Sequence, residues 1–99
     1  MEKNVILNVE YMMKPGGAKA FVQEVTESGI LADILSHEGC LRYEYFVPMD
    51  GGENLLLVER WTNAEALAKH AAQPCMAQVR AIKEKYATDT KLEKYTVIE

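Results

Sequence analysis

Four segments of the chain carry apolar residues at the spacing of β-strands. Residues 5–12 and 40–48 alternate between an apolar face and a mixed face, as a strand with one buried face does. Residues 55–58 are apolar without a break, which is typical of a strand buried on both faces. Residues 91–99 alternate and carry lysines, a pattern that indicates an edge strand protected from further pairing. The Asp50-Gly51-Gly52 turn predicts that the second and third strands form an antiparallel hairpin.

Helical spacing links the first two predicted strands. Apolar residues between Phe21 and Leu35 recur every three or four positions, and we expect one helix that begins at the Pro15-Gly16-Gly17 corner. Gly29 lies inside this helix, where it predicts a bend or a close backbone contact. Gly39 is placed to provide a left-handed cap after the helix.

A second helical region follows the third strand. Thr62 and Asn63 can each cap a helix over residues 64–71, and Pro74 then ends that helix or begins the next one. Apolar residues from Met76 onward repeat every three or four positions and predict an amphipathic helix, which we expect residues 88–90 to end. The corner between the third strand and this region carries most of the chemically unusual side chains of the chain.

The order strand, helix, strand, strand, helix pair, strand predicts an α+β fold, a ferredoxin-like βαββαβ sandwich made by one domain over residues 1–99. Helices would cover one face of an antiparallel sheet and leave the other face bare. Because three of the strands carry apolar or aromatic residues on both faces, the bare face would be a large exposed apolar patch. We therefore expect a homodimer in which the two sheet faces pack together.

Composition and charge narrow the classes of function. The 99 residues are 48% hydrophobic, and a chain of this length makes a marginally stable monomer, which also favours dimerisation. The net charge of −4 comes from interspersed basic and acidic residues, so we expect no nucleic-acid surface. No apolar run is long enough to span a membrane, and the N-terminal residues lead into a strand pattern, so we expect a cytoplasmic protein.

The two cysteines fit neither a zinc motif nor a redox motif. Cys40 and Cys75 are far apart in the sequence, so they do not form a closely spaced pair of thiols. We expect two free thiols in a reducing compartment and no metal site, and the sequence alone leaves a disulfide between them open.

Several side chains are candidates for a site, and each has a structural alternative. The ordinary pKa of His70, about 6.5, suits removal of an acidic proton at neutral pH, but a histidine here can also be a packing residue. Asn8 either faces solvent or lies in a polar-lined cavity. Trp61 is a structural anchor or a pocket wall. Glu59 and Arg60 point to opposite faces of their strand, so at most one of them faces a cavity.

For two tyrosines and a second histidine, the sequence also allows either a role in a site or a structural role. Tyr43 and Tyr45 are packing residues with wet hydroxyls, or they provide a cavity with donors that tolerate an aromatic ligand. His37 lies near the end of the first predicted helix, where an imidazole interacts favourably with the helix dipole. We interpret His37 as a capping residue rather than as a ligand.

A set of motifs resembles a known family. Residues 38–43 (EGCLRY) are followed by residues 57–61 (LVERW), by residues 64–67 (AEAL), and then by His70 and Pro74. Over residues 5–97 the chain is similar to the antibiotic biosynthesis monooxygenase family, and most similar to its small bacterial quinol-monooxygenase-type members. The resemblance implies a dimeric α/β barrel with a pocket between helices and sheet. It also implies a reaction without metal or flavin, in which the anion of a phenol or hydroquinone reacts directly with dioxygen.

The resemblance assigns roles to individual residues. His70 matches the pocket histidine of the family, and Asn8 matches a strand position from which relatives place a polar side chain into the pocket, so both are expected to be catalytic. Cys75 stands where close relatives often carry a second histidine, and its thiol would be a weaker donor there. No histidine follows in the helix from Met76, which disfavours haem degradation. The expected substrate-binding residues are Trp61, Tyr43, Tyr45, Glu59, Cys75 and Met76.

The leading hypothesis is a cytoplasmic homodimer that oxidises a small phenolic or quinol substrate with dioxygen and no cofactor. His70 would assist proton removal and Asn8 would orient the substrate. Two alternatives stay open. The same pocket could shuttle protons on a small hydroxy-ketone signal molecule, as an isomerase does. A closed core without a cavity around His70 would instead favour a non-enzymatic, dimeric ligand-binding or stress-related module.

Overall fold

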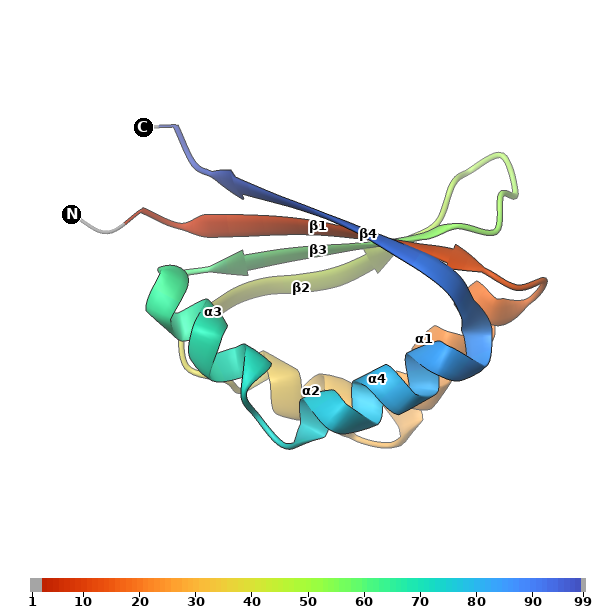
Figure 1. Cartoon of the computed structure of the whole chain (residues 1–99), viewed down its shortest axis with the longest axis horizontal. Coiled ribbons are helices and arrows are strands. Elements are labelled where there is room, and N and C mark those ends of the chain that lie inside the picture. Colours follow the sequence, from red (N-terminus) through yellow and green to blue (C-terminus); the bar gives the residue numbers. More distant parts are fainter. Residues whose placement is uncertain (1–2, 99) are drawn as a thin grey trace.

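The structure, a computed structural model, describes residues 3–98 as one layer of strands and one layer of helices (Figure 1). Within these residues no helix is long and apolar enough to cross a membrane. The elements follow in the order β1 (Val5–Met13), α1 (Gly17–Glu27), α2 (Ile30–Leu35), β2 (Cys40–Phe46), β3 (Leu55–Trp61), α3 (Ala64–Ala71), α4 (Cys75–Tyr86) and β4 (Ala87–Thr96).

The strands form one antiparallel sheet in the order β2-β3-β1-β4, which confirms the predicted α+β, ferredoxin-like arrangement. Strands β2 and β3 are the predicted hairpin, and β4 is an edge strand as expected. Strand β4 begins at Ala87, directly after α4, so the expectation that residues 88–90 only end the helix is wrong. Two of these three residues are threonines, whose branched side chains suit a pleated strand.

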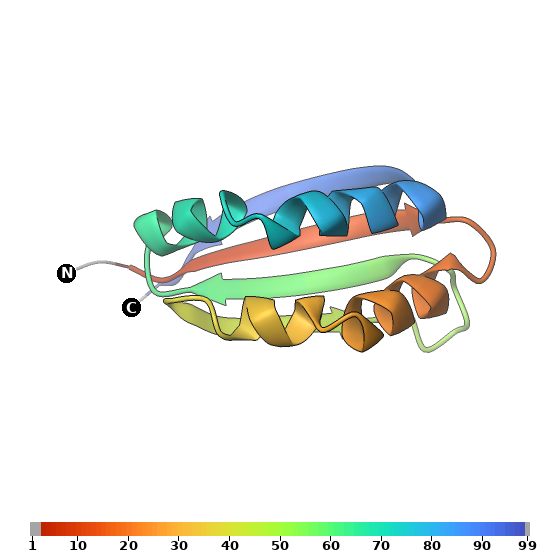
Figure 2. The same cartoon turned by 90° about the horizontal axis from the view of Figure 1, so that it is seen from below.

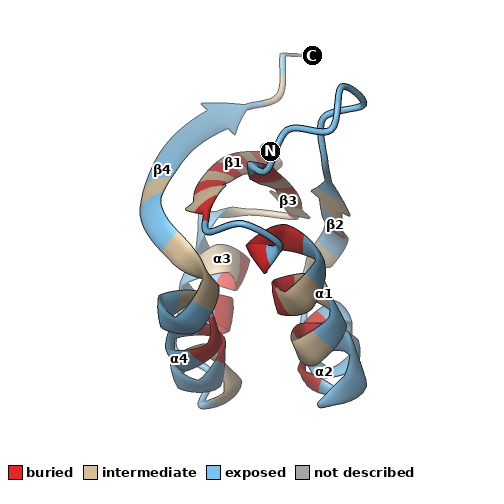
Figure 3. Cartoon of the chain, turned by 90° about the vertical axis from the view of Figure 1, so that its right-hand side faces the viewer, coloured by how far each residue is buried: buried red, intermediate tan, exposed pale blue. Residues whose placement is uncertain are grey.

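All the helices lie on one face of the sheet, in two rows (Figure 2). Helices α1 and α2 form one row and α3 and α4 the other, and the end view in Figure 3 shows buried positions where the rows face each other. The single helix expected up to Leu35 is two helices, because Gly29 adopts a φ of +84° after the end of α1. Glycine takes this conformation without steric strain, so the predicted bend is a complete break.

Alternate residues of the two central strands point into the core. Strands β1 and β3 alternate strictly between buried and half-buried positions, so the expectation that residues 55–58 are buried on both faces is wrong for the single chain. Leu55 and Leu57 are each 1% exposed, whereas Leu56 and Val58 stay half-buried on the face that the helices leave open. Successive side chains of a strand point to opposite faces of the sheet, so burial alternates along β3 even where every residue is apolar.

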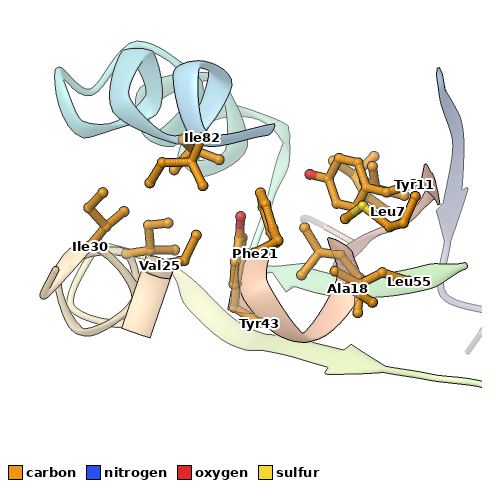
Figure 4. Close-up of a cluster of buried hydrophobic side chains, with 14 of the residues drawn as sticks. Leu7, Tyr11, Ala18, Phe21, Val25, Ile30, Tyr43, Leu55 and Ile82 are labelled. Carbon is orange, nitrogen blue, oxygen red and sulfur yellow. The ribbon is translucent and has the colours of Figure 1, made fainter. Parts of the chain in front are cut away.

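Aromatic rings fill the space between sheet and helices (Figure 4). Phe21 projects from α1 with no exposed surface, and its ring centroid lies 5.4 Å from that of Tyr11 and 5.8 Å from that of Tyr45. Val25 from α1 and Ile82 from α4 pack into the same core from the helix layer. Such ring pairs add stability beyond the apolar area that they bury.

A backbone contact at Gly39 holds the start of β2 against the start of α3. Gly39 has the predicted positive φ, +81°, although α2 already ends at Leu35. Its carbonyl oxygen accepts a hydrogen bond from the Thr62 N–H at 2.9 Å. Asn63, rather than Thr62, caps α3, because its side-chain oxygen accepts from the Ala66 N–H at 2.8 Å. This corner fixes the direction in which α3 leaves the sheet.

Gly39→Ala should destabilise the fold far more than Gly51→Ala. The two glycines have similar φ values of +81° and +87°, so each substitution adds a backbone strain of about 1–2 kcal/mol. A Cβ atom at Gly39 would also lie 2.5 Å from the Cβ of Ala66 and 2.6 Å from the Oγ1 of Thr62, whereas nothing lies within 4 Å at Gly51. We expect urea unfolding to show a loss of more than about 3 kcal/mol for Gly39→Ala. Equal losses at the two positions would contradict the tight corner.

Candidate functional site

The alternation of side chains along β3 places the carboxylate of Glu59 inside the core. Glu59 and Trp61 lie on the buried side of β3 and are 6% and 0% exposed, while Arg60 faces the other way. The sequence left open which of Glu59 and Arg60 points inward, and the structure places Glu59 there. The indole Nε1 of Trp61 donates to Oε1 of Glu59 at 2.9 Å, so this side chain has a local partner, as the structural-anchor alternative requires.

Helix α3 places His70 against Glu59 and Trp61. His70 lies on the buried face of α3, one turn beyond Ala66, and is 3% exposed. Its ring stacks on that of Trp61 at 4.3 Å between centroids and meets the ring of Tyr43 edge-on at 5.8 Å. Its Nε2 lies 3.8 Å from Oε1 of Glu59. Four of the predicted site residues therefore form one buried cluster.

A second histidine reaches the same cluster. The Nδ1 of His37 lies 2.9 Å from the Nδ1 of His70, and the Nε2 of His37 lies 3.8 Å from the Sγ of Cys75. The interpretation of His37 as a capping residue is wrong, because α2 ends at Leu35 and the imidazole makes these contacts instead. Only the tertiary contact at Gly39, which brings the segment after α2 against α3, aligns the two histidines.

The contact between the two Nδ1 atoms requires one ring to donate and the other to accept. If His37 carries its proton on Nδ1, it donates to a bare Nδ1 of His70, and its own Nε2 can accept from the thiol of Cys75. His70 then carries its proton on Nε2, which faces the Glu59 carboxylate. The reverse arrangement would direct a lone pair of His70 at that carboxylate, so the first arrangement is the favourable one.

Burial shifts this cluster toward its uncharged forms. Burial raises the pKa of Glu59 from 4.5 to about 6, against the opposing effect of the hydrogen bond from Trp61. Burial, and after it the neighbouring His37, lowers the pKa of His70 from 6.5 to about 4. His70 is therefore neutral at physiological pH, while Glu59 titrates close to it.

Three tyrosines lie on the sheet side of the core near this cluster. Burial is the main reason that the pKa values of Tyr11, Tyr43 and Tyr45 lie above the usual 10, so all three stay protonated donors. Within the described residues, the Tyr45 hydroxyl is buried and makes no well-aligned hydrogen bond, although it interacts with the neighbouring Tyr43 hydroxyl, so the prediction of wet hydroxyls is wrong for Tyr45. Such a group costs about 1–3 kcal/mol, and a bound ligand is one way to supply a well-aligned partner.

A hollow of about 810 Å³ opens beside Tyr45. It lies between α1 and the β2–β3 loop, and its lining includes Val22 of α1 and Leu55 of β3. Tyr45 connects the hollow to the cluster, because its ring centroid lies 5.9 Å from that of Tyr43, which in turn contacts His70. Of the three hollows described on residues 3–98, none is lined by His70.

The structure separates Asn8 from His70. Asn8 lies on the half-buried side of β1 and borders a different hollow, on the open face of the sheet, together with Glu10 and Leu56. The expectation that Asn8 and His70 share one pocket does not hold in the single chain. The reason is the parity of β1, whose odd-numbered residues face the helices.

The remaining predicted site residues begin α4. Cys75 contacts His37, whereas Met76 is half-buried and packs against the hydrophobic core. Cys75 and Cys40 are both free thiols, as predicted.

Comparison with known proteins adds a family context to this site. The sequence model of the family described as antibiotic biosynthesis monooxygenase matches residues 4–82. A conserved protein of unknown function from Bacteroides thetaiotaomicron, described as a candidate oxidoreductase, is 28% identical with a TM-score of 0.83, over 98% of this chain and 100% of that chain. A Deinococcus radiodurans protein assigned to the same family is 26% identical with a TM-score of 0.79, over 96% of this chain and 93% of that chain.

A third solved structure shares the fold at lower identity. SnoaB, a cofactor-independent oxygenase from Streptomyces nogalater, is 18% identical with a TM-score of 0.80, over 98% of this chain and 95% of that chain. At this identity the likeness concerns the fold alone. No curated protein matches the chain.

Glu59→Gln should change how stability depends on pH. The pKa of Glu59 in the folded chain, about 6, exceeds the ordinary 4.5, so the folded state binds the proton more tightly and wild-type stability falls as pH rises through this window. Glutamine keeps an acceptor for Trp61 and carries no charge. From about pH 4.5 to about pH 7.5, the variant should therefore gain about 1.5 kcal/mol relative to wild type in urea unfolding.

The groups that face Glu59 do not reverse this sign. His70 from α3 stays neutral over most of the window because its pKa is lowered to about 4, and Tyr43, Tyr45 and Tyr11 stay neutral because their pKa values are raised. Glu84→Gln on the exposed face of α4 is the matched control and should give a nearly constant difference. A constant difference for Glu59→Gln as well would contradict the buried carboxylate.

Proposed function

We propose that this chain, which belongs to the antibiotic biosynthesis monooxygenase family, oxidises a small phenolic or quinol substrate with dioxygen and without a bound cofactor. The observation that carries the proposal is the dry cluster beneath the helices, where His70 and Glu59 lie 3.8 Å apart and are 3% and 6% exposed. Two relatives add support. The Bacteroides thetaiotaomicron protein is described as a candidate oxidoreductase, and SnoaB, which shares the fold, is described as a cofactor-independent oxygenase.

The hollow beside Tyr45 suits a planar aromatic substrate. Its walls are largely apolar, with Ala18 and Val22 from α1 facing Leu55 and Pro48. The hydroxyl of Tyr45 is buried in the empty chain, so a movement of this side chain toward the hollow is needed for it to donate a hydrogen bond to an oxygen atom of the substrate. Tyr45 thus takes the orienting role that the sequence assigned to Asn8.

The buried pair handles the proton of the substrate hydroxyl. The rings of Tyr45, Tyr43 and His70 contact one another in sequence, which connects the hollow to the cluster. A proton that enters the cluster is taken up by the Glu59 carboxylate, the more basic group of the pair, and the Nε2–H of neutral His70 attracts that carboxylate before the proton arrives. The low polarity around the pair strengthens this attraction relative to water.

In the proposed reaction the substrate supplies all the electrons. Loss of the hydroxyl proton gives a phenolate, which transfers electrons to dioxygen far more readily than the neutral phenol does. One oxygen atom bonds to a ring carbon. The second oxygen atom then leaves as water, with the hydrogen of that ring carbon and the proton returned by the base, and a quinone carbonyl remains. A phenol and dioxygen thus give a quinone and water with no other reductant.

A homodimer through the sheet faces is part of the proposal. The open face carries half-buried Leu56 and Val58 at its centre, with Phe46 and Tyr95 41% and 45% exposed beside them. Charges of both signs lie on the same face, so a second copy related by two-fold symmetry can cover the apolar centre while opposite charges meet. The charged residues that the strand register places on this face are Glu10, Arg42, Glu44, Arg60, Asp89, Lys91 and Glu93.

One observation favours a second candidate, a non-enzymatic ligand-binding module. Among the three hollows described on residues 3–98, none is lined by His70, and side chains pack closely around the imidazole. In this alternative the hollow beside Tyr45 binds an aromatic ligand without catalysing any reaction of it.

Oxygen uptake with a panel of phenols and hydroquinones tests the proposed reaction. We expect uptake above the background of autoxidation, and ¹⁸O from labelled dioxygen in the quinone product. His70→Gln should lower the rate by at least ~100-fold, because proton transfer contributes on this scale. Folded protein that binds the compounds but consumes no oxygen would favour the binding module, and conversion of a hydroxy-ketone under strict anaerobic conditions would favour the isomerase.

Tyr45→Phe separates function from stability in the same assay. The variant loses a buried hydroxyl that makes no well-aligned hydrogen bond, so it should be at least as stable as wild type and yet have a higher KM. Tyr95→Phe removes a hydroxyl from the 45% exposed ring on β4, away from the hollow, and is the control for KM, which should not change. A stable Tyr45→Phe variant with wild-type kinetics would remove Tyr45 from the site.

Sedimentation equilibrium tests the dimer. Wild type should sediment at twice the chain mass of 11.2 kDa at micromolar concentration. Val58→Lys places an unpaired charge at the centre of the open face and should weaken the dimer by at least about 2 kcal/mol. Met49→Lys in the β2–β3 loop, where the methionine is fully exposed, is the control and should leave the dimer intact. A wild-type monomer at this concentration would contradict the proposed interface.

A further inference from the structure

Three side chains of metal-ligand type from two helical segments meet beside His70. Asp33 lies on α2, His37 follows that helix, and Cys75 is the first residue of α4. The Nε2 of His37 lies 3.8 Å from Oδ2 of Asp33 and 3.8 Å from Sγ of Cys75, and the three ligand atoms all lie within 4.8 Å of one another. We propose that Asp33, His37 and Cys75 bind a divalent transition-metal ion of the zinc class.

The donor set matches this chemistry. A thiolate, an imidazole nitrogen and a carboxylate oxygen are the three ligand types that zinc prefers, and a hard cation such as Mg²⁺ would not select the sulfur. Tetrahedral zinc with these bond lengths places its ligand atoms about 3.3–3.6 Å apart. The two contacts of His37 are therefore only a few tenths of an ångström longer than a bound ion requires.

The side chains that must move can do so. The Asp33 side chain is 56% exposed, so it can swing toward the ion and also leaves an entry path from solvent. His37 is the fixed member, since its side chain is 8% exposed. Three protein ligands leave a fourth position for water or an external ligand, as in zinc sites that are not purely structural.

A second contact supports the site independently. Metal-ligating histidines usually donate their other ring N–H to a neighbour, which fixes the tautomer and orients the ring. The Nδ1 of His37 lies 2.9 Å from the Nδ1 of His70, so the outer partner is already in place. An ion on Nε2 of His37 would hold the His37 proton on Nδ1, and this in turn would hold the proton of His70 on Nε2, toward Glu59.

A metal ion at this site takes no electrons from a substrate of the proposed oxygenase reaction. It would influence that reaction only through the tautomer of His70. The linear spacing of the three ligands matches no zinc motif, which is why the sequence predicted no metal site. They meet only because α2 and the start of α4 both reach the end of α3 at His70.

Cobalt titration of the reduced, full-length chain tests the proposal. We expect one equivalent of Co²⁺ to give a thiolate-to-cobalt charge-transfer band in the near ultraviolet, with visible bands of tetrahedral intensity, and Zn²⁺ to remove them. Cys75→Ser should abolish the charge-transfer band, and Cys40→Ser, the matched control with the other free thiol, should keep it. Asp33→Asn should weaken binding at least ~10-fold, and Glu38→Gln should not.

Thermal unfolding gives a second measurement, which shows whether a variant that fails to bind cobalt is still folded. Zn²⁺ should raise the Tm of wild type and of Cys40→Ser, but not that of Cys75→Ser, because an ion that binds only the folded state stabilises it. Absence of a charge-transfer band in folded wild type would overturn the proposal. A band that survives in Cys75→Ser, or that Cys40→Ser abolishes, would overturn it equally.

Discussion

A strand that directs a carboxylate into an apolar core determines the arrangement of the site. Glu59 is 6% exposed because the alternation that buries Leu55 and Leu57 also buries the residue two positions further along. An isolated ionised carboxylate in such a place would cost far more than a small domain can tolerate. The indole of Trp61 satisfies part of that need by donating a hydrogen bond, and Nε2 of the neutral His70 imidazole lies 3.8 Å from the same carboxylate oxygen.

Helix α3 and the segment after α2 bring the polar partners of the site together around Glu59. The Asn63 cap and the contact of Thr62 with Gly39 set the direction of α3, which lays His70 onto Trp61. The segment after α2 then brings His37 against His70. Two polar side chains of the core are thus paired, while the Tyr45 hydroxyl makes no well-aligned hydrogen bond beside the largest described hollow. That contrast is why we assign proton handling to the first group and substrate contact to Tyr45.

Local patterns predicted most of the fold but only part of the site. Alternation and helical spacing located the strands and helices, and the Asn63 cap was one of two caps that the sequence allowed. Residues 88–90 were interpreted as a break because the start of β4 depends on pairing with β1, which no local signal records. The apolar run at 55–58 could not reveal its own parity, since every residue in it is apolar.

The site was harder to predict from the sequence than the fold, because it depends more on contacts between residues far apart in the chain. His70, Glu59 and Trp61 were predicted because they surround one strand-to-helix corner, close in the sequence. Asn8 was grouped with them by resemblance, yet the parity of β1 places it on the opposite face. His37 was interpreted as a cap because its contact with His70 spans 33 positions, and no local signal in the sequence indicates that contact.

The most direct test of the buried cluster is the ring ¹⁵N spectrum of the two histidines at about pH 5.5. We expect His70 to be still neutral there, because its pKa is lowered to about 4. We also expect a single tautomer with the proton on Nε2 and a bare Nδ1 facing His37. A doubly protonated His70 at that pH, or fast exchange between both tautomers, would mean that the imidazole is solvated, and the site described here would not exist.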